Sequence, residues 1–194
     1  MNIIEKNAVA WYVLRVTYQR EIAASKALEE MHIEHYVPTI RTRIRNDKGV
    51  SIGWKVEPLV HNYIFINDSY ENILNLKQGK LDYLRFIMAK DDKGLNDVPQ
   101  YVPDKQMADF IKVVRTMGSK PVDPNIDLKK GDRVRVLTGP FEGVEGVFVR
   151  MPNRHEKRVV VQIAGVAAFA TQTLNASDVE RIEVKEEKTK KYNI

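Results

Sequence analysis

The most restrictive features of this 194-residue sequence are absences. It contains no cysteine, which excludes disulfides and thiolate metal sites and is typical of a reducing compartment. No apolar run approaches the roughly 20 residues that a membrane helix needs. The N-terminus does not join a basic segment to an apolar core, so we expect no signal peptide and a cytoplasmic protein.

Residue patterns that carry catalysis are also missing. Of the four histidines, His32 and His35 have a spacing that could share a metal on a helix. That helix is expected to end there, however, and no carboxylate pair completes the set, so surface histidines are the better interpretation. No glycine loop that would cradle phosphate precedes a helix, and no nucleophile lies beside a histidine in a recognisable signature. We therefore expect no enzymatic activity, metal or cofactor.

What the sequence does contain is typical of a globular protein of one large or two small domains. Hydrophobic residues make up 43% and charged residues 29% of the chain. The net charge of +5 and the pI near 9.3 mildly favour contact with polyanions.

The first half of the chain alternates between strand and helix patterns. Residues 11–18 are apolar on both faces, as in a central strand, and apolar residues then recur at helical spacing over residues 19–32. The polar, basic segment 41–54 indicates an exposed hairpin tip. Further on, the patterns predict a strand at 63–66, a helix capped by Asn67–Ser69, a strand at 83–89 and a helix opening at Pro103–Asp104. The order β-α-β-β-α-β-α predicts a ferredoxin-like sandwich with one extra helix.

The second half begins after a segment that reads as a linker. Residues 118–125 contain two prolines and a glycine without apolar periodicity. Residues 126–183 hold five short strand candidates separated by turn signals, which suggests a small closed barrel. Within them, GDRVRVLTGPFEGVEG at 131–146 predicts a sharply bent hairpin in which Gly139, Gly143 and Gly146 are architectural. The charge-dense tail, 184–194, is expected to be disordered.

These motifs together resemble a known family. The run 131–146 resembles the KOW motif of proteins that work on RNA polymerase or the ribosome. With Trp11-Tyr12 in the first strand and the run Glu57–Ile66 before the second helix, the order resembles NusG-type transcription elongation factors over residues 9–183. The resemblance implies an α+β chain: an NGN domain with a ferredoxin-like sandwich at 9–117, a linker at 118–125, and an SH3-like KOW β-barrel at 126–183.

The resemblance implies that the NGN domain docks on the clamp helices of RNA polymerase and lowers pausing. The residues that match the family's docking surface are Trp11, Tyr12, Val60, Tyr63 and Phe65. Val60 stands where a phenylalanine is usual, and His61-Asn62 replaces a Pro-Gly or Pro-Asn pair. Trp11 and Phe65 are equally compatible with a place in the core, whereas Tyr63 favours the partner because tyrosine offers a large area with few rotors.

Two basic regions are candidates for contact with non-template DNA or a nascent RNA leader. Arg15, Tyr18 and Arg20 lie where specialised family members read the exposed non-template strand, and they combine cations with an aromatic ring. The second region is the hairpin with Arg41, Arg43, Arg45 and Lys48, for which DNA or the opposite wall of the polymerase cleft would be the partner. A solvated charged edge that protects the sheet from aggregation is the alternative for both regions.

The KOW domain of the general factor binds termination factor Rho or a ribosomal protein through an exposed Phe and Arg around a glycine. The matching turn here is Ile163–Phe169, and Ala164 and Val166 stand at those two positions. Because the aromatic and cationic anchors are missing, Rho binding is not expected. Ile163 and Phe169 leave an apolar patch for another partner, such as a ribosomal protein.

The phrase Glu57-Pro58-Leu59 with Asn62-Tyr63 is most similar to specialised paralogues, closest to the UpxY-type antiterminators of bacterial capsular-polysaccharide loci. That similarity implies a monomer, associated with the nucleoid through RNA polymerase, that promotes read-through of particular long operons. Two alternatives stay open. One is a general elongation factor that couples polymerase to Rho or the ribosome, and the other is a KOW protein that binds ribosomal RNA.

Overall fold

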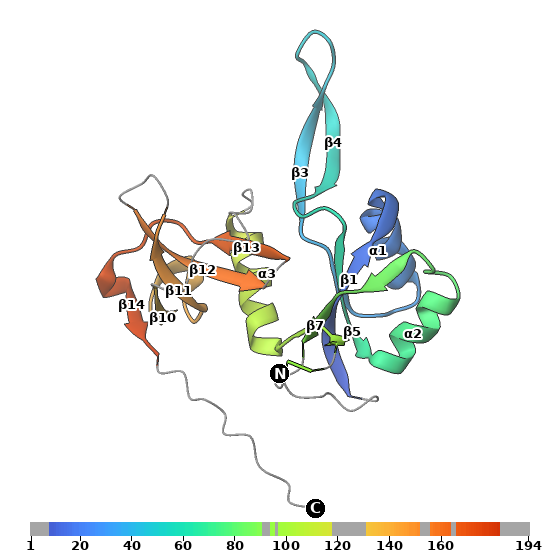
Figure 1. The fold of residues 1–194 in the computed structure, drawn as a ribbon. Helices are drawn as coiled ribbons and strands as arrows, with labels where there is room; N and C mark the ends of the chain where they lie inside the picture. The colour runs from blue at the N-terminus through green and yellow to red at the C-terminus, as the bar shows by residue number, and fades with distance from the viewer. Residues whose placement is uncertain are drawn as a thin grey trace, which may run out of the picture.

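The computed structural model describes residues 8–90, 94–95, 97–117, 131–151, 156–163 and 166–182. Within these ranges the chain is a mixed α/β protein with three α-helices and strands arranged in four sheets (Figure 1). No helix in the described part is long and apolar enough to cross a membrane. The predicted linker at 118–125 and tail at 184–194 lie outside the described residues.

The N-terminal sheet is built around one long strand. Its members are β1 (Val9–Val16), β2 (His35–Tyr36), β5 (Tyr63–Ser69), β6 (Leu84–Phe86) and β9 (Tyr101–Val102). They run in the order β2-β5-β1-β6 with β9 also pairing with β1, and all pairs are antiparallel. Along β1, Tyr12 and Leu14 enter one core and Trp11 and Val13 enter another. The prediction of a strand that is apolar on both faces is therefore confirmed.

Helices cover both faces of this sheet. The helices α1 (Glu21–Glu30) and α2 (Tyr70–Gln78) cover the face that carries Tyr12, and α3 (Asp104–Met117) covers the face that carries Trp11 (Figure 1). The Ser69 hydroxyl accepts a hydrogen bond from the Asn72 N–H at 3.2 Å and caps α2 as predicted.

The segment 41–54, predicted to be an exposed hairpin tip, belongs to a longer hairpin. Strands β3 (Thr39–Arg45) and β4 (Ser51–Pro58) form a two-stranded ribbon that projects away from the rest of the molecule (Figure 1). Its turn is closed by the Asn46 side chain, which accepts from the N–H groups of Lys48 and Val50, and by Gly49 at a φ of 76°. The exposed segment is therefore a hydrogen-bonded two-stranded extension of the fold.

The strand predicted at 83–89 divides into two. Strand β6 pairs with β1, whereas β7 (Met88–Lys90) pairs with β8 (Asp97–Pro99) in a separate small sheet. Ile87 lies at the break, where its N–H donates to Val13 and its carbonyl accepts from Gln100. The uniform apolar pattern of this segment did not reveal that its hydrogen-bond partners change.

The C-terminal sheet contains five antiparallel strands. They are β10 (Asp132–Val136), β11 (Glu145–Arg150), β12 (Lys157–Ile163), β13 (Ala167–Ala170) and β14 (Val179–Arg181), in the order β13-β12-β11-β10-β14. The turn after β10 contains Gly139 and Gly143 at φ values of 80° and 81°. A Cβ on Gly146 would lie 2.6 Å from the carbonyl oxygen of Val160, so close strand approach requires glycine there.

Candidate functional site

The structure brings most of the predicted docking residues together beneath α3. Trp11, Val60 and Phe65 are 7%, 9% and 0% exposed in one apolar cluster, and Tyr63 packs against it while half-buried. Tyr12 does not join them, because it lies on the opposite face of β1 and contacts Phe86 edge-to-face at 5.8 Å. The sequence pattern placed Trp11 and Tyr12 side by side, but strand alternation separates them.

An aromatic row extends this cluster into α3. The Phe110 ring lies 5.5 Å from Phe65, 6.3 Å from Tyr36 and 5.3 Å from Phe169 of β13. Burial raises the pKa of Tyr36 to about 12, opposed by the positive charge of Arg115. The row therefore joins the N-terminal sheet to the C-terminal sheet through one helix.

One turn of the C-terminal sheet was predicted to bind a partner protein, and it packs into the same apolar cluster. Ile163, Val166 and Phe169 are 1%, 5% and 1% exposed, and Ala164 lies outside the described residues. The candidate surfaces of the two halves thus face one another across α3. In this arrangement neither surface is open to another molecule.

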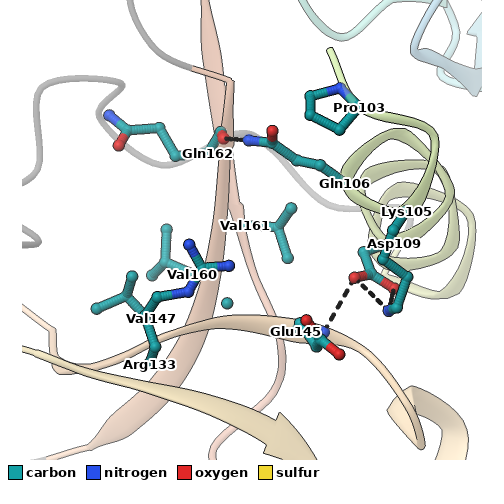
Figure 2. A pocket seen from close by; sticks show the side chains of 11 residues that line it. Pro103, Lys105, Gln106, Asp109, Arg133, Glu145, Val147, Val160, Val161 and Gln162 are labelled. Carbon is teal, nitrogen blue, oxygen red and sulfur yellow. Dashed lines mark hydrogen bonds and ion pairs between the residues drawn. The ribbon is translucent and has the colours of Figure 1, made fainter. Parts of the chain in front are cut away.

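Polar contacts also join α3 to the C-terminal sheet (Figure 2). The buried Asp109 carboxylate accepts from the Lys105 ammonium at 2.6 Å and from the Glu145 N–H at 3.1 Å. Lys105 also donates to the Gly143 carbonyl, and Gln106 donates to the Gln162 carbonyl at 2.6 Å. A cavity of about 510 Å³ lies between α3 and the sheet, lined in part by Arg133, Gln106 and Glu145. The contacts tie one helix face to the backbone of two strands.

A buried carboxylate holds the turn that leads into Tyr63. Glu21 is 1% exposed, and its Oε1 accepts from the Asn62 N–H at 2.5 Å and lies 4.0 Å from His61 Nδ1. Asn62 adopts a φ of 68°, a conformation that asparagine and glycine tolerate best. Glu21 was missed because a glutamate at the start of a helix ordinarily faces solvent.

Of the predicted residues Arg15, Tyr18 and Arg20, the last two form a cation–aromatic cluster together with Tyr83. The Arg20 guanidinium lies 5.5 Å from the Tyr18 ring and 5.1 Å from the Tyr83 ring. Tyr18 is 82% exposed and adopts a φ of 62°, and Gln19 follows at 52°. Left-handed backbone at consecutive non-glycine residues is unfavourable and concentrates at functional sites.

A shallow pocket of about 530 Å³ adjoins this cluster. Arg15 and Tyr18 line it together with Asn62, Arg85 and Met88. Arg85 was missed in the sequence, as was Tyr83, because both lie in an ordinary strand pattern 65 or more positions from Tyr18. The pocket combines two guanidinium groups with a projecting aromatic ring, which can contact phosphate and base surfaces.

His32 and His35 do not come together in a comparable site. The His35 ring nitrogens lie 2.7 Å from the Ser25 hydroxyl and 2.8 Å from the Ile33 carbonyl, while His32 is exposed beyond the end of α1. In the described ranges, no three His, Asp or Glu side chains form a group that could hold a metal ion.

Comparison with known proteins gives a match over the N-terminal half. The family described as transcription termination factor NusG matches residues 9–111, more than half of the chain. A solved structure on domain interaction in Thermotoga maritima NusG is 22% identical, covers 91% of this chain and 98% of its own, and has a TM-score of 0.39. One of an MjSpt4:Spt5 complex is 14% identical, covers 89% and 97%, and has a TM-score of 0.27.

Proposed function

Because this chain belongs to the NusG family, we propose that it binds RNA polymerase during elongation, suppresses pausing and termination, and promotes read-through of particular long operons. The closest subtype is the UpxY-type antiterminator of capsular-polysaccharide loci. The factor acts as a monomer in the cytoplasm, at the nucleoid, through its attachment to polymerase.

We assign the two halves to distinct domains. The N-terminal sheet with α1 and α2 on one face supports a ferredoxin-like NGN domain over 9–117. The five-stranded antiparallel sheet with its glycine-rich turns supports an SH3-like KOW barrel over 126–183.

The polymerase clamp helices dock on the apolar cluster of Trp11, Val60, Tyr63 and Phe65. Tyr63 is its half-buried edge, and the Glu21 contact holds the preceding turn in place. The C-terminal sheet packs on Phe110 of α3 through Phe169, and α3 in turn covers Trp11, Val60 and Phe65. Both the sheet and α3 must therefore move before the clamp helices can reach these three side chains. Tyr12 contributes from the other face by supporting β1.

The observation that carries operon specificity is the cluster of Arg15, Tyr18 and Arg20. A tyrosine that is 82% exposed beside a guanidinium suits the stacking of an unpaired base and the contact of its phosphate. A general factor, which acts at every transcribed sequence, has no use for such a reader. The basic ribbon with Arg41, Arg43, Arg45 and Lys48 adds further contact with nucleic acid.

A reconstituted transcription assay tests the proposal. Templates that carry the cognate operon leader, and matched templates with that leader scrambled, are transcribed through a terminator with and without the full chain. We expect increased read-through only with the cognate leader, and loss of polymerase binding in Tyr63→Ala. Normal polymerase binding without increased read-through on any leader would show that antitermination is wrong.

A general elongation factor is the second candidate: Ile163 and Phe169, each 1% exposed against α3, would become an apolar surface for a partner if the C-terminal sheet left that helix. Capture of Rho or a ribosomal protein by the full chain, together with association with most transcripts in cells, would favour it. Tight binding to ribosomal RNA that does not depend on Tyr63 would instead identify a ribosomal KOW protein.

A further inference from the structure

The two faces of the β3–β4 ribbon carry different chemistry. Directly opposed residues in an antiparallel pair project to the same side. The register opposes Arg41 to Val56 and Arg43 to Trp54 on one face, and Thr42 to Lys55 on the other. A bulge between Ile44 and Arg45 shifts the pairing near the tip, where Arg45 opposes Ser51.

The face with Thr42 satisfies its own charges. The Glu57 carboxylate accepts from the Thr42 hydroxyl at 2.6 Å and pairs with the Lys55 ammonium at 2.6 Å. Hydrogen bonds from Lys55 and then Thr42 lower the pKa of Glu57, so this carboxylate is ionised at neutral pH. This face offers little net charge to a partner.

The opposite face leaves cations and an aromatic ring in solvent. Arg41, Arg43 and Arg45 are exposed, and none of them has an ion pair among the described residues. The Arg43 guanidinium lies 5.1 Å from the Trp54 ring, yet Trp54 remains 60% exposed. Val56, beside Trp54 on the same face, is 48% exposed. We call the surface formed by Arg41, Arg43, Arg45, Trp54 and Val56 the ribbon face.

The ribbon face fits a single strand better than a duplex. Alternate residues on a strand lie about 6.5–7 Å apart, so the three arginines form a row along the ribbon. Such a row can follow a phosphate backbone, and an exposed indole offers a flat surface on which an unpaired base can stack. Bases in a duplex are already stacked and do not present that surface.

We infer that the ribbon face binds single-stranded DNA, with its arginines on the phosphates and a base stacked on Trp54. The inference rests on the proposed function and deepens it, because the non-template strand of DNA is unpaired where polymerase transcribes. Trp54 is the residue that distinguishes this inference from a general basic surface.

A binding titration without polymerase tests the inference. The full chain is added to a fluorescein-labelled 12-nucleotide single strand of mixed sequence, and anisotropy is followed at several salt concentrations. Trp54→Leu is expected to raise Kd roughly 5- to 150-fold, the range for loss of one base–aromatic stack. The association constant K falls as salt rises, and Arg41→Gln and Arg45→Gln are each expected to make the negative slope of log K against log salt shallower by about 0.7.

The opposite face provides a matched control. Lys55→Ala removes one cation from the opposite face of the same ribbon and leaves the Glu57 carboxylate with its Thr42 hydrogen bond. It removes no arginine and no ring, so Kd is expected to change only through this screened surface charge, by less than about 2-fold. This comparison also separates the ribbon from the cluster around Tyr18, which stays intact in all these variants. Each variant alters an exposed side chain, and its unfolding curve is measured to confirm that the fold is kept.

Tryptophan fluorescence gives an independent reading. The chain has two tryptophans, and Trp11 is only 7% exposed. DNA is therefore expected to quench the emission of Trp54 and to leave that of Trp11 nearly unchanged, so Trp54→Leu removes the quenching.

Several outcomes would overturn the inference. Equal effects of Trp54→Leu and Lys55→Ala would show that the ribbon face is not a stacking surface, and equal or tighter binding to duplex DNA or to RNA of the same sequence would exclude the assigned partner. Loss of polymerase binding in Trp54→Leu with unchanged DNA binding would identify a protein contact. If the chain promotes read-through but does not bind single-stranded DNA through the ribbon face, this inference is wrong and the proposed function is not affected. If it binds DNA in this way but has no effect on polymerase, the proposed function is wrong and this inference is not affected.

Discussion

Phe110 of α3 packs edge-to-face against Phe169 of β13, with ring centroids 5.3 Å apart and ring planes at 80°. Phe110 also contacts Phe65 of the N-terminal sheet. Residues from both halves of the chain therefore share one apolar cluster. The contact joins the two halves of the chain through α3.

Removing either ring is expected to destabilise this shared cluster. Phe110→Ala and Phe169→Ala should each lower the free energy of unfolding by about 3–5 kcal/mol, because both side chains are at most 1% exposed. In the double variant the losses should fall short of their sum by about 0.5–1.5 kcal/mol, the contribution of the ring pair. Urea unfolding measures all three, with Ile22→Ala, on the exposed side of α1, as control. Strict additivity would show that the rings do not interact.

Asp109 is expected to control how tightly the C-terminal sheet is held. Asp109→Ala leaves the Glu145 N–H without its acceptor and the Lys105 ammonium with the Gly143 carbonyl alone. The cost should be about 1–3 kcal/mol, with faster hydrogen exchange at the amide of Glu145. Exchange is followed by NMR, and Asp97→Ala, which removes an exposed carboxylate in β8, serves as control. Unchanged exchange at Glu145 would mean that the apolar contacts alone hold the sheet.

Gly146 and Gly53 make a matched pair of strand glycines. A Cβ at Gly146 would meet the Val160 carbonyl at 2.6 Å and the Val159 side chain at 2.7 Å, whereas at Gly53 the nearest atom is 3.9 Å away on Ile44. Gly146→Ala should therefore cost about 2 kcal/mol or more, and Gly53→Ala should change stability by no more than about 0.5 kcal/mol. Thermal unfolding of the two variants decides this, and equal midpoints would contradict the close approach of β11 and β12.

The elements that were predictable from the sequence are those whose cause is local. Ser69 caps a helix because its hydroxyl meets an amide three residues on, and β1 was recognisable because one short run of the sequence carries apolar residues on both faces. The packing of the C-terminal sheet on α3 was not predictable. An amphipathic pattern shows that one face of a helix is buried, but it does not identify the element that buries it. Only part of the ribbon face could be predicted. The alternating arginines indicated an exposed basic segment, but the sequence did not show that Trp54 lies opposite Arg43, which only the strand register reveals.

Stability is expected to fall at high pH through Tyr36. Burial raises the pKa of this tyrosine from 10.0 to about 12, so the folded protein favours the protonated phenol. The contribution is complete below pH 10 and is lost as the pH rises through about 12; at about 1.4 kcal/mol per pKa unit it amounts to at most about 3 kcal/mol. Denaturant unfolding between pH 8 and 12 should show this decline, and Tyr36→Phe should make it shallower. An identical decline in Tyr36→Phe would assign it to other groups.

Tyr18 allows backbone strain and function to be measured separately. Its φ of 62° suits glycine, and its side chain is 82% exposed, so Tyr18→Gly should leave the free energy of unfolding within about 1 kcal/mol of the parent. Tyr18→Ala keeps the strained backbone and should be the less stable of the two. If the ring reads an unpaired base, both variants should lose read-through on the cognate leader, whereas Tyr18→Phe should retain it. Reconstituted transcription beside urea unfolding gives both quantities, and full read-through in Tyr18→Gly would show that the strained tyrosine does not contact nucleic acid.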